Sequence, residues 1–163
     1  MKKSNLLTCV ILLLSLSHSA VGASSKVDLN YEKNILSTIE QYTHASIFGE
    51  ENVFKEVTSE NFIIINTNGA ADSRLFELGQ LAPRKEAEFV RYESSSINIE
   101  KIELSSTKRL AMVYVTWRTK GINLEEESVF DGTSKYIFIL GYNFPDLDSK
   151  TRRWIVLSRI AFP

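Results

Sequence analysis

The stretch LAMVYVTWRTK, residues 110–120, decides the fold of this 163-residue chain. Its odd positions from Ala111 to Trp117 are apolar, and so are its even positions from Leu110 to Tyr114. A run this rich in β-branched and aromatic residues predicts a β-strand. Because apolar residues occupy both faces for most of its length, we expect the strand to be covered on both sides.

Further strands flank this segment. Residues 95–104 alternate through three isoleucines, with a slip in the period that indicates a bulge. After a polar turn at 121–127, residues 128–142 form the next strand, and residues 153–162 follow a loop at 143–150 as the last one. Four strands joined by turns predict an antiparallel meander.

The first half of the chain is dominated by helical periodicity. Residues 30–48 place Ile35, Ile39 and Tyr42 on one side of a helix, which Gly49 ends. The other predicted elements are a short helix at 50–57, a strand at 62–65 with a turn at 66–69, and helical pieces in 72–92 that break near Pro83 and bury Ala87, Phe89 and Val90. Helices that precede a meander predict an α+β fold, in which N-terminal helices pack on one face of a curved antiparallel sheet.

Residues 1–23 have the three-part layout of a secretory signal peptide: two lysines, an apolar run and a small polar segment. The apolar run has about ten residues, against the ~20 that a membrane span requires. We expect cleavage after Ala23, which leaves residues 24–163 as one domain in the periplasm of a Gram-negative bacterium or outside the cell. Acylation of Cys9 stays open as an alternative, because residues 6–9 resemble a lipoprotein box.

Cleavage narrows the possible chemistry of the remaining 140 residues. The chain's one cysteine, Cys9, leaves with the signal, so neither a disulfide nor a thiolate ligand is expected. The loss of two lysines leaves 17 basic against 20 acidic residues and no basic stripe, which argues against nucleic acid and membrane surfaces as partners. With His44 as the one remaining histidine, we expect neither a metal nor a cofactor.

Four segments then resemble a known superfamily in their order and spacing: residues 42–50 (YTHASIFGE), 62–66 (FIIIN), 129–138 (VFDG leading to YIF) and 153–158 (RWIVLS). They resemble the nuclear transport factor 2-like proteins, which include ketosteroid isomerases and SnoaL-like polyketide cyclases. The resemblance implies a cone-shaped sheet that curls around a pocket, helices on its concave face, and an opposite face that often forms a homodimer. Members include isomerases, cyclases, dehydratases, ligand carriers and protein-binding modules, so the resemblance predicts fold better than function.

Two residues are candidates through this resemblance. Tyr42 resembles the helix-borne tyrosine that donates a hydrogen bond to the substrate oxygen in ketosteroid isomerases, although it also fits a simple core aromatic. Asn66 stands where those isomerases keep an aspartate base, and an amide cannot accept a proton at neutral pH. Asn66 therefore orients a ligand or starts the turn at 66–69. His44 lies opposite the apolar stripe of its helix and should face solvent.

The strands supply the other candidates. Tyr114, Thr116 and Arg118 share one face of their strand, and Ser158 lies in the last strand. If these residues face the concave side, they line the pocket, and Arg118 at its mouth binds an anionic group. The alternative for Arg118 is a surface arginine at the end of a strand.

The sequence thus favours a binding domain that holds a small apolar ligand or a partner protein as a homodimer. The alternative is an isomerase, dehydratase or cyclase that uses Tyr42 with a carboxylate such as Asp72, Glu77 or Asp131. Because no base is identified, the sequence leaves the catalytic residues, and enzyme activity itself, open.

Overall fold

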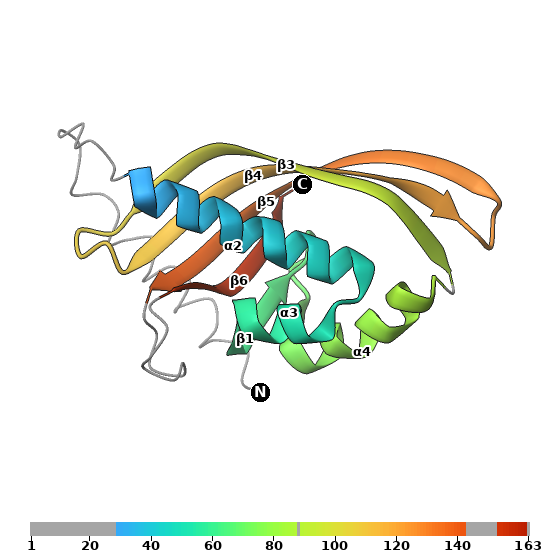
Figure 1. The fold of residues 1–163 in the computed structure, drawn as a ribbon, viewed down its shortest axis with the longest axis horizontal. Helices are drawn as coiled ribbons and strands as arrows, with labels where there is room; N and C mark the ends of the chain where they lie inside the picture. Colours follow the sequence, from blue (N-terminus) through green and yellow to red (C-terminus); the bar gives the residue numbers. More distant parts are fainter. Residues whose placement is uncertain (1–28, 88, 143–152, 163) are drawn as a thin grey trace.

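The computed structural model describes residues 29–87, 89–142 and 153–162. Its elements are the helices α2 (Leu29–Phe48), α3 (Glu51–Val57) and α4 (Arg74–Glu86) and the strands β1 (Thr58–Ile65), β2 (Ala71–Ser73), β3 (Val90–Leu104), β4 (Leu110–Asn123), β5 (Ser128–Tyr142) and β6 (Trp154–Phe162). A curved sheet arches over the helices, which lie on its concave side (Figure 1). The predicted signal peptide at 1–23 and the predicted loop at 143–150 lie outside the described residues.

Helix α2 confirms the predicted amphipathic helix. Ile35, Ile39 and Tyr42 are completely buried in the core, as their spacing predicts. Gly49 ends the helix with a φ of 69°, and a Cβ atom there would lie 2.2 Å from the carbonyl oxygen of Leu81 in α4. Glycine therefore serves both the left-handed turn and the close contact with α4.

The sheet is mixed rather than wholly antiparallel. Its strand order is β2-β1-β6-β5-β4-β3, and all neighbours are antiparallel except β1 and β6, which run parallel. The sequence correctly predicts antiparallel pairs where turns join the strands. Because α4 and the four strands β2 to β5 separate β1 from β6 in the chain, no turn fixes their relative direction, and the prediction of a wholly antiparallel sheet is wrong at this pair.

Strands β3 to β5 form a long meander that extends beyond the helices (Figure 1). The register of β3 on β4 shifts between Tyr92 and Ser94 and again between Ile99 and Lys101. The second shift confirms the bulge that the sequence predicts. Bulges bend a strand and increase its twist, which is how the sheet curves around α2.

Helix α4 differs from its prediction in two ways. It continues through Pro83 as one helix, and the carbonyl that loses its hydrogen-bond donor belongs to the exposed Gly79. The expected buried side also fails, because α4 ends at Glu86 with Ala87 in a left-handed conformation. Phe89 then lies in the connection to β3 with 54% of its surface exposed.

The two faces of the sheet differ in what covers them. The odd positions of β4, from Ala111 to Trp117, are buried against the helices. The even positions Met112, Tyr114 and Thr116 are half-buried on the opposite face, which we call the outer face. The described residues therefore cover one side of β4, not both as the sequence predicts.

Candidate functional site

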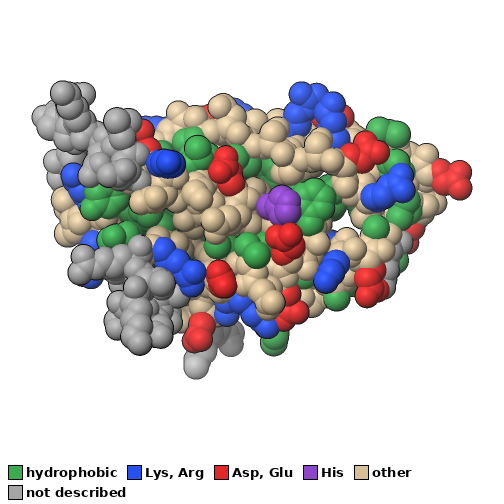
Figure 2. Space-filling model, in the orientation of Figure 1, with side chains coloured by type: hydrophobic (Ala, Val, Ile, Leu, Met, Phe, Trp, Pro, Cys, Tyr) green, Lys and Arg blue, Asp and Glu red, His purple; other side chains and the backbone are tan. Residues whose placement is uncertain are grey.

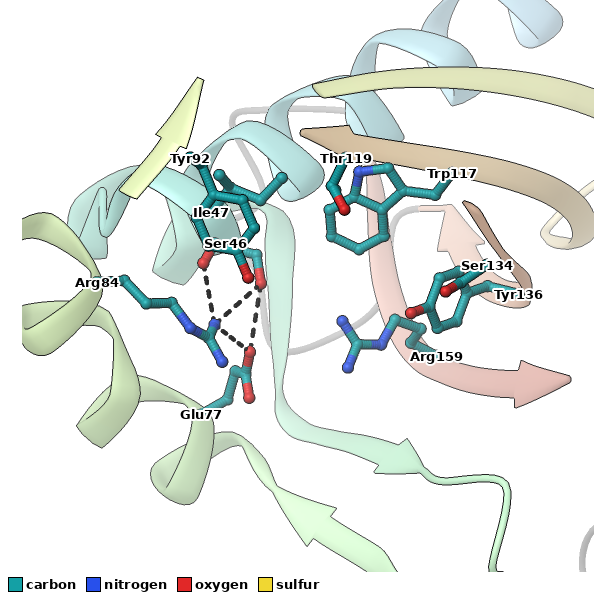
Figure 3. A pocket seen from close by; sticks show the side chains of 10 residues that line it. All are labelled: Ser46, Ile47, Glu77, Arg84, Tyr92, Trp117, Thr119, Ser134, Tyr136 and Arg159. Carbon is teal, nitrogen blue, oxygen red and sulfur yellow. Dashed lines mark hydrogen bonds and ion pairs between the residues drawn. The ribbon is translucent and has the colours of Figure 1, made fainter. Parts of the chain in front are cut away.

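A cavity of about 210 Å³ opens on the concave side of the sheet, at the end where β3 to β5 overhang α4 (Figure 3). Its lining comes from α2 (Ser46, Ile47), α4 (Glu77, Arg84), β3 (Tyr92), β4 (Trp117, Thr119), β5 (Ser134, Tyr136) and β6 (Arg159). Pockets for drug-sized ligands span about 300–1,000 Å³. The cavity therefore suits a smaller molecule.

An ion pair between Glu77 and Arg84 forms one wall of the cavity. Arg84 Nη1 lies 2.6 Å from Glu77 Oε1, and the side chain of Glu77 is 5% exposed. Arg84 Nη1 also donates to the Ser46 carbonyl oxygen at 2.9 Å, and Ser46 Oγ donates to Glu77 Oε1 at 3.3 Å. Charge-assisted hydrogen bonds of this kind tie α4 to the end of α2 and neutralise both charges.

A second cation, Arg159, faces this pair across the cavity, and Figure 3 shows both guanidinium groups pointing inward from opposite sides. The Arg159 guanidinium carbon lies 5.2 Å from the ring centroid of Tyr136 and 6.0 Å from that of Trp117, which places it in cation–π range. No carboxylate of the described residues lies within salt-bridge distance of Arg159. Its Nε atom is buried and has no hydrogen-bond partner among them.

Tyr42 lies in the core and does not line the cavity. The rings of Phe54, Phe62 and Phe138 surround it, with centroids 5.3–5.6 Å away. Burial raises the pKa of the Tyr42 hydroxyl to about 12, and the nearby Arg159 acts in the opposite direction. The hydroxyl is therefore protonated at neutral pH, and it has no hydrogen-bond partner among the described residues.

Of the predicted site residues, Tyr42 lies closest to the cavity, since its ring is 6.0 Å from the Arg159 guanidinium carbon. Asn66 lies elsewhere: its backbone N–H donates to the Ala70 carbonyl, and its side chain donates to Asp72 Oδ2 at 2.8 Å. This is the turn-starting role that the sequence offers as the alternative for Asn66. The same hydrogen bond places Asp72 away from the cavity.

The candidates of β4 lie on the outer face, away from the cavity. Thr116 donates to Glu100, and the Tyr114 hydroxyl lies 3.7 Å from Met112 Sδ. Arg118 makes two hydrogen bonds to Asp131, at 2.6 and 2.7 Å, and their side chains are 54% and 37% exposed.

The sequence could not show which face of β4 is concave, because a period of two shows only which side chains share a face. The odd face, with Trp117 and Thr119, is the one that lines the cavity.

Ser158 is displaced from the cavity by a bulge in β6. Leu140 pairs with Val156 and Ile139 with Ser158, so that Leu157 is an extra residue. The extra residue moves Ser158 to the outer face and brings the next residue, Arg159, to the concave face opposite Phe138. Sequence reasoning missed Arg159, although an arginine inside an apolar terminal strand is a detectable signal.

His44 is exposed, as its helical position predicts. Its Nδ1 atom lies 3.1 Å from Glu50 Oε2, and its ring lies tilted against that of Phe48, with the centroids 4.6 Å apart. In Figure 2 its purple side chain lies on a surface where acidic and basic side chains are scattered rather than gathered. Within the described ranges, no three acidic, histidine or cysteine side chains gather as metal ligands, and no helix is long and apolar enough to cross a membrane.

No family model and no curated protein matches the chain in sequence. Solved structures match its fold. A nuclear transport factor 2-like protein of unknown function from Prochlorococcus marinus is 18% identical with a TM-score of 0.61, over 80% of this chain and 90% of that one. A ketosteroid isomerase-like protein from Erwinia carotovora atroseptica is 14% identical with a TM-score of 0.60, over 79% and 92%. At such identities the likeness concerns the fold alone: the chain has the nuclear transport factor 2-like α+β fold, with a six-stranded sheet that curves without closing.

Proposed function

We propose that residues 24–163 form an exported domain that binds a small molecule in the cavity between α2, α4 and the sheet. The observation that carries this proposal is the cavity itself. Six elements, α2, α4 and β3 to β6, place aromatic and charged side chains around one space of about 210 Å³. Concave, preformed sites with a few convergent polar groups are typical of ligand binding.

The lining argues against a wholly apolar ligand. Glu77, Arg84 and Arg159 all border the cavity, and hydrocarbon against these groups would remove water without replacing its hydrogen bonds. The aromatic rings of Tyr92, Trp117 and Tyr136 still offer apolar contact area. We therefore propose a ligand with both an apolar part and a polar group.

We also propose that the domain is a homodimer that pairs through the outer face. The described helices leave this face uncovered (Figure 1). Half-buried apolar side chains run across four of its strands: Ile63, Ile65, Met112, Tyr114, Ile137, Ile139 and Ile160. A second copy would cover the face that the apolar pattern of residues 110–120 predicts to be buried.

Two matched tryptophan substitutions test small-molecule binding. Ser134 lines the cavity, and its neighbour Thr133 lies on the outer face of the same strand. Both residues are exposed, so that either position accepts a larger side chain. Ser134→Trp should fill the cavity and abolish the thermal stabilisation that a metabolite library gives the wild type, whereas Thr133→Trp should retain it. The proposal fails if no compound stabilises the wild type more than Ser134→Trp.

A second candidate function, proton transfer next to a carbonyl, is favoured by the position of Glu77. Of the three carboxylates that the sequence offers, Glu77 borders the cavity, whereas Asp72 and Asp131 do not. Glu77 would take the proton, and the Tyr42 hydroxyl would stabilise the enolate oxygen. Deuterium exchange of the α-protons of small ketones, followed by NMR, tests this function: wild type should accelerate exchange and Glu77→Gln should not.

Export is tested on the protein recovered from the periplasm of an expressing bacterium. Cleavage after Ala23 predicts a mature chain that begins at Ser24, with the mass of residues 24–163. A product whose first residue is an acylated Cys9 would establish the lipoprotein alternative. Retention of the complete chain in the cytoplasm would contradict both.

A further inference from the structure

We infer that the ligand carries a carboxylate, which the Arg159 guanidinium holds, and a flat unsaturated group, which lies against Trp117 and Tyr136. This inference rests on the proposed small-molecule function and names the chemical class of its ligand.

The charges around the cavity do not cancel. Glu77 and Arg84 neutralise each other at 2.6 Å, which leaves Arg159 as a cation with no carboxylate partner among the described residues. A cation withdrawn from water is stabilised by an anion, and the guanidinium fork matches the two oxygens of a carboxylate. The empty space beside Arg159 is therefore complementary to a single negative charge.

An unsatisfied polar atom agrees with this sign. Arg159 Nε is buried without a partner in the described part of the chain. A guanidinium can only donate hydrogen bonds. An unpaired guanidinium beside a cavity requires an acceptor, and a carboxylate supplies two acceptor oxygens.

The rings around Arg159 fix its position and define the rest of the site. The centroids of Trp117 and Tyr136 are 5.6 Å apart, and the guanidinium lies within 6.0 Å of both. Cation–π contacts hold the side chain in place before a ligand binds, which lowers the entropy cost of binding. A flat ring or double bond attached to the carboxylate would extend over the same aromatic surfaces.

A carboxylate fits better than a phosphate dianion. One uncompensated arginine balances one negative charge, because Glu77 already neutralises the charge of Arg84. The volume of about 210 Å³ also favours a compact acid. Inorganic phosphate is therefore the appropriate competing probe.

Isothermal titration calorimetry of the wild-type protein at pH 7 and low salt tests the inference without any substitution. The probes are benzoate and cinnamate, their neutral analogues benzamide and cinnamamide, and inorganic phosphate. We expect each acid to bind at least about tenfold more tightly than its amide, because a charge-assisted hydrogen bond is replaced by a neutral one. We expect phosphate to bind more weakly than either acid.

Three substitutions locate the binding site. Arg159→Gln should weaken benzoate binding at least about tenfold. Arg118→Gln removes an arginine from the outer face and should leave the affinity unchanged. Arg159→Lys keeps the charge but not the fork and should bind with intermediate affinity.

The outcomes separate this inference from the function on which it rests. If amides bind as well as acids, or phosphate binds more tightly than both, the carboxylate assignment is wrong while small-molecule binding stands. If Arg118→Gln weakens binding as much as Arg159→Gln does, the anion lies elsewhere. If neither these probes nor a metabolite library binds in the cavity, both proposals fail.

Discussion

Tyr42→Phe should stabilise the ligand-free protein, although it removes a polar group from the core. The ring would keep its contacts with Phe54, Phe62 and Phe138, while the buried hydroxyl, which has no partner among the described residues, would disappear. Leaving a buried hydroxyl unsatisfied costs about 1–3 kcal/mol. We expect the free energy of unfolding to rise by about that amount.

Urea unfolding followed by tryptophan fluorescence measures this change. With a slope of about 2 kcal/mol/M, the midpoint should move up by about 0.5–1.5 M. The matched control is Tyr114→Phe on the outer face, where the hydroxyl is half-buried and contacts Met112. That change should stay within about 0.5 kcal/mol of the wild type.

Alkaline pH should enlarge the difference between the wild type and Tyr42→Phe. The pKa of Tyr42 is about 12 in the folded chain and 10.0 for an unperturbed tyrosine, so the unfolded chain releases this proton first. The free energy of unfolding of the wild type does not depend on this proton below pH 10, and it falls as the pH rises from 10 toward 12. At pH 11 the wild type should lose about 1.4 kcal/mol that the phenylalanine variant keeps.

One result would refute this reasoning. If Tyr42→Phe lowers the free energy of unfolding by more than about 1 kcal/mol at pH 7 while Tyr114→Phe does not, the Tyr42 hydroxyl has a stabilising partner in the ligand-free protein. An unchanged difference at pH 11 would show that burial does not raise the pKa of Tyr42.

Three further substitutions test the fold, the cavity wall and the outer face. Gly49→Ala should lower the free energy of unfolding in urea by at least about 2 kcal/mol, because the φ of Gly49 is 69° and the added methyl would lie 2.2 Å from a carbonyl oxygen of α4. The control, Gly79→Ala on the open side of α4, should raise the free energy of unfolding by about 0.5–1 kcal/mol. Glu77→Gln should lower the free energy of unfolding by about 3 kcal/mol, because it leaves the partly buried Arg84 without its charge partner. The control, Glu51→Gln in an exposed ion pair, should leave the urea midpoint unchanged. Ile139→Lys should convert the proposed homodimer to a monomer in light scattering, and a wild type that is already monomeric would contradict the dimer.

The sequence determines the local elements of this protein and the class of its fold. A period of 3.6 residues identifies helix α2 and the burial of Ile35, Ile39 and Tyr42, because those side chains share one side of a helix whatever packs against it. A period of two identifies β3, β4 and β5, and the short turns between them fix their antiparallel pairing. These features depend on neighbours in the chain, so the chain alone specifies them.

Tertiary structure decides which residues form the cavity. The concave face of β4 is the one with Trp117 rather than Arg118, because α2 packs against that side. The extra residue in β6 exchanges Ser158 for Arg159 at the site, and a bulge exists only relative to the partner strand. The parallel pairing of β1 with β6 likewise joins segments far apart in the chain. Local periodicity says which side chains share a face, but only contacts between distant segments decide what that face meets.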